Sequence, residues 1–288
     1  MNEYFAPAKV NLHLAITNVR DDGYHELDTS FVFTDLHDVL TIRLASDLQV
    51  RCSIPAFDGP LNLVHQILSA FRIKYQVKQG LDVFIKKNIP AQAGLGGGSS
   101  DAATALLVAN RLWGVGASPQ ELINFAVPFG ADIPCFLFGK ASAAKGIGER
   151  LVAYTGQIPD QCMVLAWPGE GVSTVQAFAH FDRNKFHALT EEKAAAKVRA
   201  RSDGDGFEMG FNDLEQSAVT ICAPLAKMLK VMRERSERAW MSGSGSACVA
   251  ACGSLDQAEN VVRVLQSQNL ATWTHIGRFV REHPLVKE

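Results

Sequence analysis

Alternation between apolar and polar residues at the start of the chain predicts paired strands. Apolar side chains occupy every second position from Val10 to Ile16, and the alternation returns over 31–33 and 39–44 after a polar loop at 18–23. A period of two places neighbouring side chains on opposite faces of a strand. The first 45 residues are therefore expected to form strands joined by turns.

Helical spacing of apolar residues follows in three segments. Residues 61–75 and the sequence DAATALLVANRLWG, which ends in a glycine, carry apolar side chains three or four positions apart. A third helix is expected in SPQELINFAVPFG, where Ser118 is typical of an N-cap and Pro119 of the first helical position. Between the first two helices, residues 81–85 alternate and predict a strand that Pro90 ends.

The second half of the chain mixes strands and helices in a similar way. Residues 162–168 predict a buried strand that opens a second domain. A charged helical segment at 190–201 and a loop at 203–206 follow, then one or two helices over 211–235. The last 50 residues read as strand, Gly/Ser loop, strand, helix and strand. Strands come in pairs before helices, which favours an α+β fold over a doubly wound sheet.

Size and composition limit the class of protein. With 288 residues, 47% of them hydrophobic, the chain can bury a sizeable core as one large domain or two medium ones. A net charge of -2 lacks the basic surface of a nucleic-acid binder. No apolar run approaches the roughly 20 residues of a membrane helix, and no secretory pattern stands at the N-terminus. Six scattered cysteines without CxxC indicate reduced thiols. We expect a cytoplasmic protein with no nucleic-acid and no membrane partner.

Glycine is concentrated between the strand at 81–85 and the next helix. Four of the five residues from Gly94 to Gly98 are glycine, which leaves backbone amides uncovered and free to adopt positive φ. Such amides bind anions together with the positive end of the following helix dipole. Ser99 and Ser100 stand where an N-cap belongs and can donate hydroxyl groups to phosphate. A tight strand-to-helix turn without a ligand is the alternative.

This loop follows neither of the two best-known phosphate-binding patterns. The sequence contains no GxxxxGK[ST], because Ala141 follows Gly139-Lys140, and GxGxxG fails because Ser99 replaces the third glycine. An ATP enzyme with this loop therefore belongs to neither the P-loop nor the Rossmann class.

Two further motifs flank the loop in sequence. In PAKVNLHL, residues 7–14, the alternation places Lys9, Asn11 and His13 on one face of a strand, where they line a cleft or are simply exposed to solvent. In MSGSGSACVAAC, residues 241–252, the glycines at 243 and 245 indicate a second close backbone approach or a hairpin turn.

These three motifs, in this order, resemble the GHMP kinases, a superfamily named for galactokinase and homoserine, mevalonate and phosphomevalonate kinases. It carries an N-terminal PAK-type motif, a central GLG-G-SS loop and a C-terminal glycine-rich loop. Within it, RDDGYHEL (20–27), GLGGGSSDAA, GADIPCFLFG (130–139) and FNDLE (211–215) resemble the family of 4-diphosphocytidyl-2-C-methyl-D-erythritol kinases. The resemblance covers residues 4–181 and 207–253. Residues 183–206 match nothing in it, and Leu61 stands where an acidic residue is common.

The resemblance implies an α+β, two-domain GHMP kinase fold. An N-terminal ribosomal-protein-like α/β domain (1–157) and a C-terminal α+β domain (158–288) would enclose a cleft. It also implies ATP-dependent phosphorylation of the 2-hydroxyl of 4-diphosphocytidyl-2-C-methyl-D-erythritol, in the non-mevalonate route to isoprenoid precursors. The alternatives are another GHMP kinase that acts on homoserine or a mevalonate derivative, a catalytically silent nucleotide-binding relative, and an RNA-binding module.

The resemblance further implies roles for single residues. Lys9 and Asp132 match the catalytic lysine and base, although Asp132 could instead be a helix cap or a turn residue. Tyr24 and His25 match the cytidine site, with a turn-capping role as the alternative for His25. The full set of expected substrate-binding residues is Asn11, Tyr24, His25, Gly243 and Gly245. Phe178 and Phe181 are candidates for a second stacking surface, and His13 and His37 are interpreted as structural.

ATP and Mg²⁺ are the cofactors that the resemblance implies. ATP binding is assigned to the loop composed of Pro90, Ala91, Gln92, Ala93, Gly94, Leu95, Gly96, Gly97, Gly98, Ser99 and Ser100. Magnesium would arrive on the nucleotide phosphates with Ser100 as a possible contact, and the sequence shows no dedicated metal site. The expected partner is a small-molecule substrate, and the expected assembly is a monomer or homodimer.

Overall fold

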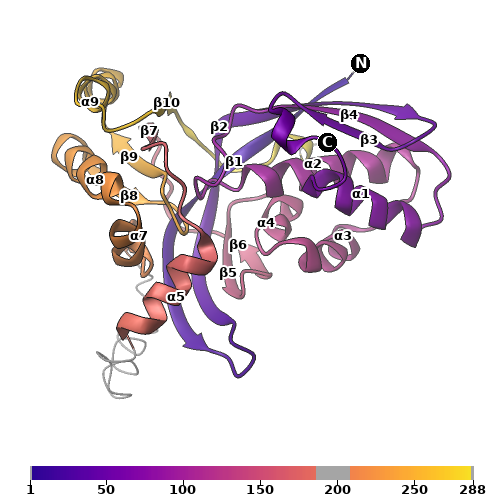
Figure 1. The fold of residues 1–288 in the computed structure, drawn as a ribbon, viewed down its shortest axis with the longest axis horizontal. Helices are drawn as coiled ribbons and strands as arrows, with labels where there is room; N and C mark the ends of the chain where they lie inside the picture. The colour runs from indigo at the N-terminus through magenta and orange to yellow at the C-terminus, as the bar shows by residue number, and fades with distance from the viewer. Residues whose placement is uncertain (1, 186–207, 287–288) are drawn as a thin grey trace.

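The computed structural model of the chain describes residues 2–185 and 208–286. These residues form a larger and a smaller β-sheet that lie side by side, each covered by helices (Figure 1). The predicted helical segment 190–201 and the loop 203–206 lie outside the described residues.

A single long strand organises the larger sheet. β2 (His25–Ala45) pairs along one edge with β1 (Asn2–Val19) in antiparallel register. Along its other edge it pairs in succession with β5 (Ser142–Gly146), β11 (Phe279–Val280) and β4 (Gly80–Lys86). Two short strands complete the sheet. β3 (Gln49–Cys52) pairs with β4 in parallel, and β6 (Arg150–Ala153) pairs with β5 in antiparallel orientation.

One face of this sheet is covered by helices. They are α1 (Leu63–Lys74), α2 (Gly97–Leu112), α3 (Pro119–Ala126) and α4 (Ile133–Phe138), with 3-10 turns at Pro55–Phe57 and Val127–Phe129. Large side chains such as Phe33, Phe71 and Phe136 are completely buried in the core between these helices and the sheet.

The smaller sheet is antiparallel throughout. Its order is β10 (Trp273–Gly277), β7 (Cys162–Trp167), β9 (Cys248–Cys252) and β8 (Arg238–Met241). A second core forms between it and the helices α5 (Thr174–Lys185), α7 (Glu215–Ile221), α8 (Ala223–Arg235) and α9 (Leu255–Ser267).

A third hydrophobic core lies between the two sheets. Val10 and Leu12 of β1 pack there with Leu165 and Trp240 of the smaller sheet. The outer edge of β1 is also joined to the chain ahead of α7, because Gly210 N–H donates to the carbonyl of Leu12 at 2.7 Å. Since burial of apolar surface is the main stabilising term in packing, the two sheets hold one another in a fixed relation.

Several predicted elements are confirmed. The helix predicted at 61–75 is α1, and the predicted strand at 162–168 is β7. The helix predicted after Ser118 is α3, where Ser118 and Glu121 form a reciprocal capping box. The fold is α+β, as predicted. Among the helices of residues 2–185 and 208–286, none combines the length and the apolar character that a membrane span requires.

The predicted start of α2 is wrong. The helix begins at Gly97 instead of Asp101, and its N-cap is Gly96, in the left-handed region at φ +70°. A Cβ at Gly96 would lie 2.9 Å from Phe136 and 3.0 Å from the Lys9 side chain, so glycine is required there. Ser99 and Ser100 are consequently inside the first helical turns and are not N-caps.

Solvent exposure of the polar face of β1 is also excluded. Lys9, Asn11 and His13 are all buried. A register shift between Asn11 and His13 interrupts the alternation, and the His13 ring contacts Asp28 at 3.1 Å and the Ser30 hydroxyl at 2.9 Å. His13 therefore has partners within the hairpin, in agreement with its structural interpretation.

The C-terminal segment returns to the larger sheet. β11 pairs with Thr34 and Phe33 of β2, and the 3-10 turn Pro284–Val286 buries Leu285 in the first core. The predicted C-terminal domain of 158–288 thus includes residues that pack on the larger sheet, because β2 offers an unpaired edge between β5 and β4. The boundary at 157/158 itself stays a prediction.

Candidate active site

A cleft of about 1200 Å³ lies where the two sheets and their helices meet. Its walls come from β1 and β2, the loop before α2, the residues around Asp132, the first turns of α5 and the loop between β8 and β9. Of the residues predicted for the site, Ser100 and Phe181 alone do not line this cleft. The three sequence motifs, the first and last of which are more than 200 positions apart, are therefore neighbours in space.

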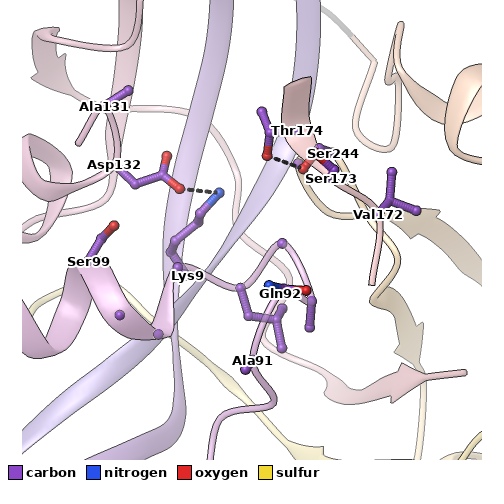
Figure 2. A pocket seen from close by; sticks show the side chains of 18 of the residues that line it. Lys9, Ala91, Gln92, Ser99, Ala131, Asp132, Val172, Ser173, Thr174 and Ser244 are labelled. Atoms are coloured by element: carbon purple, nitrogen blue, oxygen red, sulfur yellow. Dashed lines mark hydrogen bonds and ion pairs between the residues drawn. The ribbon is translucent and has the colours of Figure 1, made fainter. Parts of the chain in front are cut away.

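The side chains of Lys9 and Asp132 point toward one another in the cleft (Figure 2). The Lys9 ammonium lies 3.4 Å from a carboxylate oxygen of Asp132 and donates a 2.8 Å hydrogen bond to Asn11 Oδ1. The Lys9 side chain is only 4% exposed, whereas that of Asp132 is 38% exposed. Although Asp132 precedes α4, its side chain makes no capping hydrogen bond, so the alternative role as a helix cap is excluded.

The two glycine-rich loops touch. The Ser242 hydroxyl donates to the carbonyl of Gly94 at 3.2 Å, and the Ala247 N–H donates to the carbonyl of Ala93 at 2.9 Å. Gly94 has φ +79°, and a Cβ there would lie 2.5 Å from the carbonyl oxygen of Ser242. Glycine at this position thus permits a backbone-to-backbone approach that any side chain would prevent.

The loop from Ser242 to Ala247 fits both interpretations of its sequence. It joins β8 to β9, which are antiparallel, and so it is a hairpin connection. It also presents Gly243 and Gly245 to the cleft. A Cβ on Gly243 would lie 3.4 Å from Lys9 Nζ and 3.3 Å from Asn11 Oδ1, so the C-terminal loop abuts the Lys9 motif directly.

One end of the cleft is formed by the tip of the β1–β2 hairpin and by α5. Tyr24 is 60% exposed there. His25 stacks on Phe178 with ring centroids 4.5 Å apart, and its Nε2 lies 2.7 Å from a carboxylate oxygen of Asp182. The His25 ring thus pairs with α5, across the cleft end from its own turn. Phe178 lines the cleft, whereas Phe181 is buried in the second core.

A buried charged cluster adjoins the cleft beside Gly97 at the start of α2. Lys87 Nζ donates to Asp38 and, at 2.7 Å, to Asp101. Burial raises the pKa of Asp101 to about 8 and outweighs the opposing effect of Lys87. One cation with two carboxyl groups would otherwise leave a net negative charge in the interior, so Asp101 holds a proton near neutral pH.

In residues 2–185 and 208–286 there is no group of three His, Cys, Asp or Glu side chains that could hold a metal ion. Ser100 is completely buried, its hydroxyl has no hydrogen-bond partner among the described residues, and it does not line the cleft. The Ser99 hydroxyl does line it (Figure 2).

Some cleft residues carry no recognisable signal in the sequence. The Thr174 hydroxyl at the start of α5 lies 2.9 Å from that of Ser244 and joins α5 to the second glycine loop (Figure 2). Asp182 and Thr29 lie in ordinary helical and strand patterns, so only their partners His25 and Asn11 mark them.

The sequence matches the family described as GHMP kinases N terminal domain over residues 62–140 and the one described as GHMP kinases C terminal over 189–271. A 4-diphosphocytidyl-2-C-methyl-D-erythritol kinase from Desulfitobacterium hafniense is 37% identical over 280 residues, which cover 95% of both chains. The chain belongs to the 4-diphosphocytidyl-2-C-methyl-D-erythritol kinase family of GHMP kinases. The family recognised from the sequence motifs is thus confirmed, and so is the kinase class of the chain.

Solved structures agree with this assignment. A crystal structure of 4-(cytidine 5'-diphospho)-2C-methyl-D-erythritol kinase superimposes with a TM-score of 0.77 at 31% identity, covering 96% of this chain and 99% of that one. A homoserine kinase from Cytophaga hutchinsonii has a TM-score of 0.69 at 15% identity and coverage of 98% and 96%. The second likeness shows the shared fold alone, and the GHMP kinase fold is confirmed.

Proposed function

We propose that this kinase transfers the γ-phosphoryl group of ATP to the 2-hydroxyl of 4-diphosphocytidyl-2-C-methyl-D-erythritol, a step toward isoprenoid precursors. The observation that carries the proposal is the Lys9–Asp132 pair, 3.4 Å apart in a cleft that also contains a glycine-rich loop. The family's near-full-length likeness favours this acceptor over homoserine or mevalonate derivatives.

In the proposed reaction Asp132 acts as the base. The acceptor oxygen attacks the γ-phosphorus, its proton passes to the Asp132 carboxylate, and the bond between the γ-phosphorus and the β–γ bridging oxygen breaks to release ADP. Charge gathers on the phosphoryl oxygens in the loose transition state, so positioning and electrostatic stabilisation carry most of the catalysis. Lys9, whose ammonium lies beside Asp132, is the cation that stabilises this charge.

The proposed ATP site is the loop from Pro90 to Ser100. Its cleft-facing part combines backbone amides near the left-handed Gly96 with the positive end of α2, a helix of 16 residues. Magnesium is proposed to arrive on the nucleotide phosphates and to offset their charge. Ser99, which lines the cleft, is a better-placed hydroxyl contact for it than Ser100, which does not.

The proposed site for the second substrate extends from the Lys9–Asp132 pair to the tip of the β1–β2 hairpin. Asn11 and Gly243 lie beside Lys9, Gly245 lies beside Gly94, and Tyr24 and His25 form the end of the cleft at the hairpin tip. A cytosine ring can stack on an aromatic side chain, and an exposed Tyr24 offers such a surface. Cytoplasmic location and a monomeric or homodimeric state stay predictions.

A coupled ADP-release assay tests the proposal. The purified protein, supplied with ATP and Mg²⁺, is compared on 4-diphosphocytidyl-2-C-methyl-D-erythritol, mevalonate, homoserine and galactose. The cytidyl substrate is expected to give the highest kcat/KM by a wide margin. Faster turnover of homoserine or mevalonate would overturn the assignment of the acceptor, and no turnover of any substrate would favour a catalytically silent relative.

A further inference from the structure

The ammonium of Lys9 is held from behind by a chain of buried hydrogen bonds. It donates to Asn11 Oδ1 at 2.8 Å, and Asn11 Nδ2 donates to Thr29 Oγ1 at 2.9 Å. The Thr29 hydroxyl in turn donates to the backbone carbonyl of His13. Lys9, Asn11 and Thr29 are each at most 3% exposed, so water does not substitute freely for these partners.

Thr29 sets the donor-to-acceptor direction of this series of hydrogen bonds. A threonine hydroxyl has one proton, and here that proton goes to the His13 carbonyl. Toward Asn11, Thr29 Oγ1 can therefore act only as an acceptor, and the Asn11 amide must present its NH₂ group to it. The Asn11 carbonyl oxygen is then forced to face Lys9.

The orientation of the Asn11 amide matters because Lys9 carries only donors. With the amide as observed, Lys9 has an acceptor behind it and the Asp132 carboxylate in front of it. A flipped Asn11 amide would point its NH₂ group at the Lys9 ammonium. The two donors would repel one another, and the ammonium would lose its buried acceptor. The ammonium would then leave the place from which it reaches the reacting groups.

We infer that Thr29 is a positioning residue, which fixes the Asn11 amide and through it the Lys9 ammonium. Thr29 acts without touching the reacting atoms. The inference rests on the proposed function, since Lys9 is given its catalytic role there. It identifies a polar requirement near the start of β2, at a position where the strand pattern alone would accept any β-branched residue.

Thr29→Val tests the inference, because valine keeps the shape and removes the hydroxyl. Without the Thr29 acceptor the Asn11 amide is no longer fixed and the Lys9 ammonium is misplaced, so kcat should fall by about 10- to 100-fold. KM for ATP and for the cytidyl substrate should stay within about 3-fold, because the Thr29 hydroxyl is already engaged by the Asn11 amide and the His13 carbonyl. Thr29→Ser keeps the hydroxyl and should restore most of kcat.

A double-mutant cycle separates positioning from general damage. Aspartate at position 11 has oxygen on both sides and presents an acceptor to Lys9 in either orientation. In the Asn11→Asp background, Thr29→Val should therefore cost less than about 3-fold in kcat, against 10-fold or more with Asn11 present. If Thr29→Val does not fold, Thr29→Cys, with its weaker donor and acceptor, replaces it in the same cycle.

The outcomes are distinct. Equal losses in both backgrounds would show a merely structural threonine, and a raised KM for the cytidyl substrate at constant kcat would show direct substrate contact. Either result overturns the inference. A Thr29→Val enzyme as active as the wild type would also overturn it while leaving the proposed function intact. A wild-type protein inactive on the whole substrate panel would instead refute the proposed function.

Discussion

Replacement of the proposed base gives the sharpest test of the mechanism. Asp132→Asn keeps the size and shape of the side chain and removes its ability to accept a proton. Because Asp132 makes no capping hydrogen bond, the change should not affect the start of α4. Among the described residues, the Asp132 carboxylate forms an ion pair only with Lys9, at 3.4 Å. In the variant, the Lys9 ammonium still has Asn11 Oδ1 as a hydrogen-bond acceptor.

The expected magnitudes for activity and stability differ widely. A positioned base contributes about 10²- to 10⁴-fold, or roughly 3–5 kcal/mol, so kcat should fall by that order. The folded state should lose at most about 1 kcal/mol, because the Asp132 side chain is 38% exposed and solvent screens its pairing with Lys9. For a chain of this size that corresponds to a melting temperature lowered by about 4 °C or less.

The assay is coupled ADP release under saturating ATP and cytidyl substrate, with circular dichroism and thermal melting as folding controls. Both KM values should stay within a few-fold of wild type, provided that KM approximates binding. Lys9→Ala should also lower kcat. The double variant should be little worse than the poorer single one if the residues act as a unit. A folded Asp132→Asn enzyme with near-wild-type kcat would show that Asp132 is not the base.

Three further predictions concern other parts of the molecule. A Cβ added at Gly98 meets nothing within 4 Å beyond its chain neighbours and its own helix backbone, so Gly98→Ala should fold normally. It should nevertheless weaken ATP binding in titration calorimetry if the phosphates approach that backbone, and an unchanged affinity would place them elsewhere. His25→Ala should raise KM for the cytidyl substrate more than KM for ATP, whereas equal changes would indicate a structural histidine. Burial lowers the pKa of His283 to about 4 from its ordinary 6.5, so the unfolded chain takes up the proton first and stability falls as the pH drops from 6.5 toward 4. Urea unfolding should show that this part of the pH dependence is lost in His283→Gln; an unchanged slope would contradict the assignment.

The sequence by itself determined the elements and the family. Periodicity predicted the strands and helices because a buried face imposes a period of two or 3.6 on any amphipathic element. Local chemistry predicted the α3 cap, since Ser118 and Glu121 are only three positions apart. Three motifs in a fixed order identified a GHMP kinase, which is a property of the chain that needs no coordinates.

Tertiary structure decided what depends on contacts between distant residues. α2 begins at Gly97 because Gly96 must fit against Phe136 and Lys9, which no local rule includes. The burial of Lys9 follows from its contacts with Gly96 ahead of α2, the Phe31 ring and Gly243 of the second glycine loop. The polar face of β1 could therefore not be distinguished from a solvated one beforehand.

The supporting residues of the site were likewise invisible in the sequence. Asp182 is 157 positions from its partner His25, and Thr29 is 18 positions from Asn11 on the neighbouring strand. A hydrogen bond requires two groups within about 3 Å with suitable geometry. Sequence shows which groups a residue carries, but only the folded chain determines which of them meet, and that meeting is what orients the Lys9 ammonium and the His25 ring.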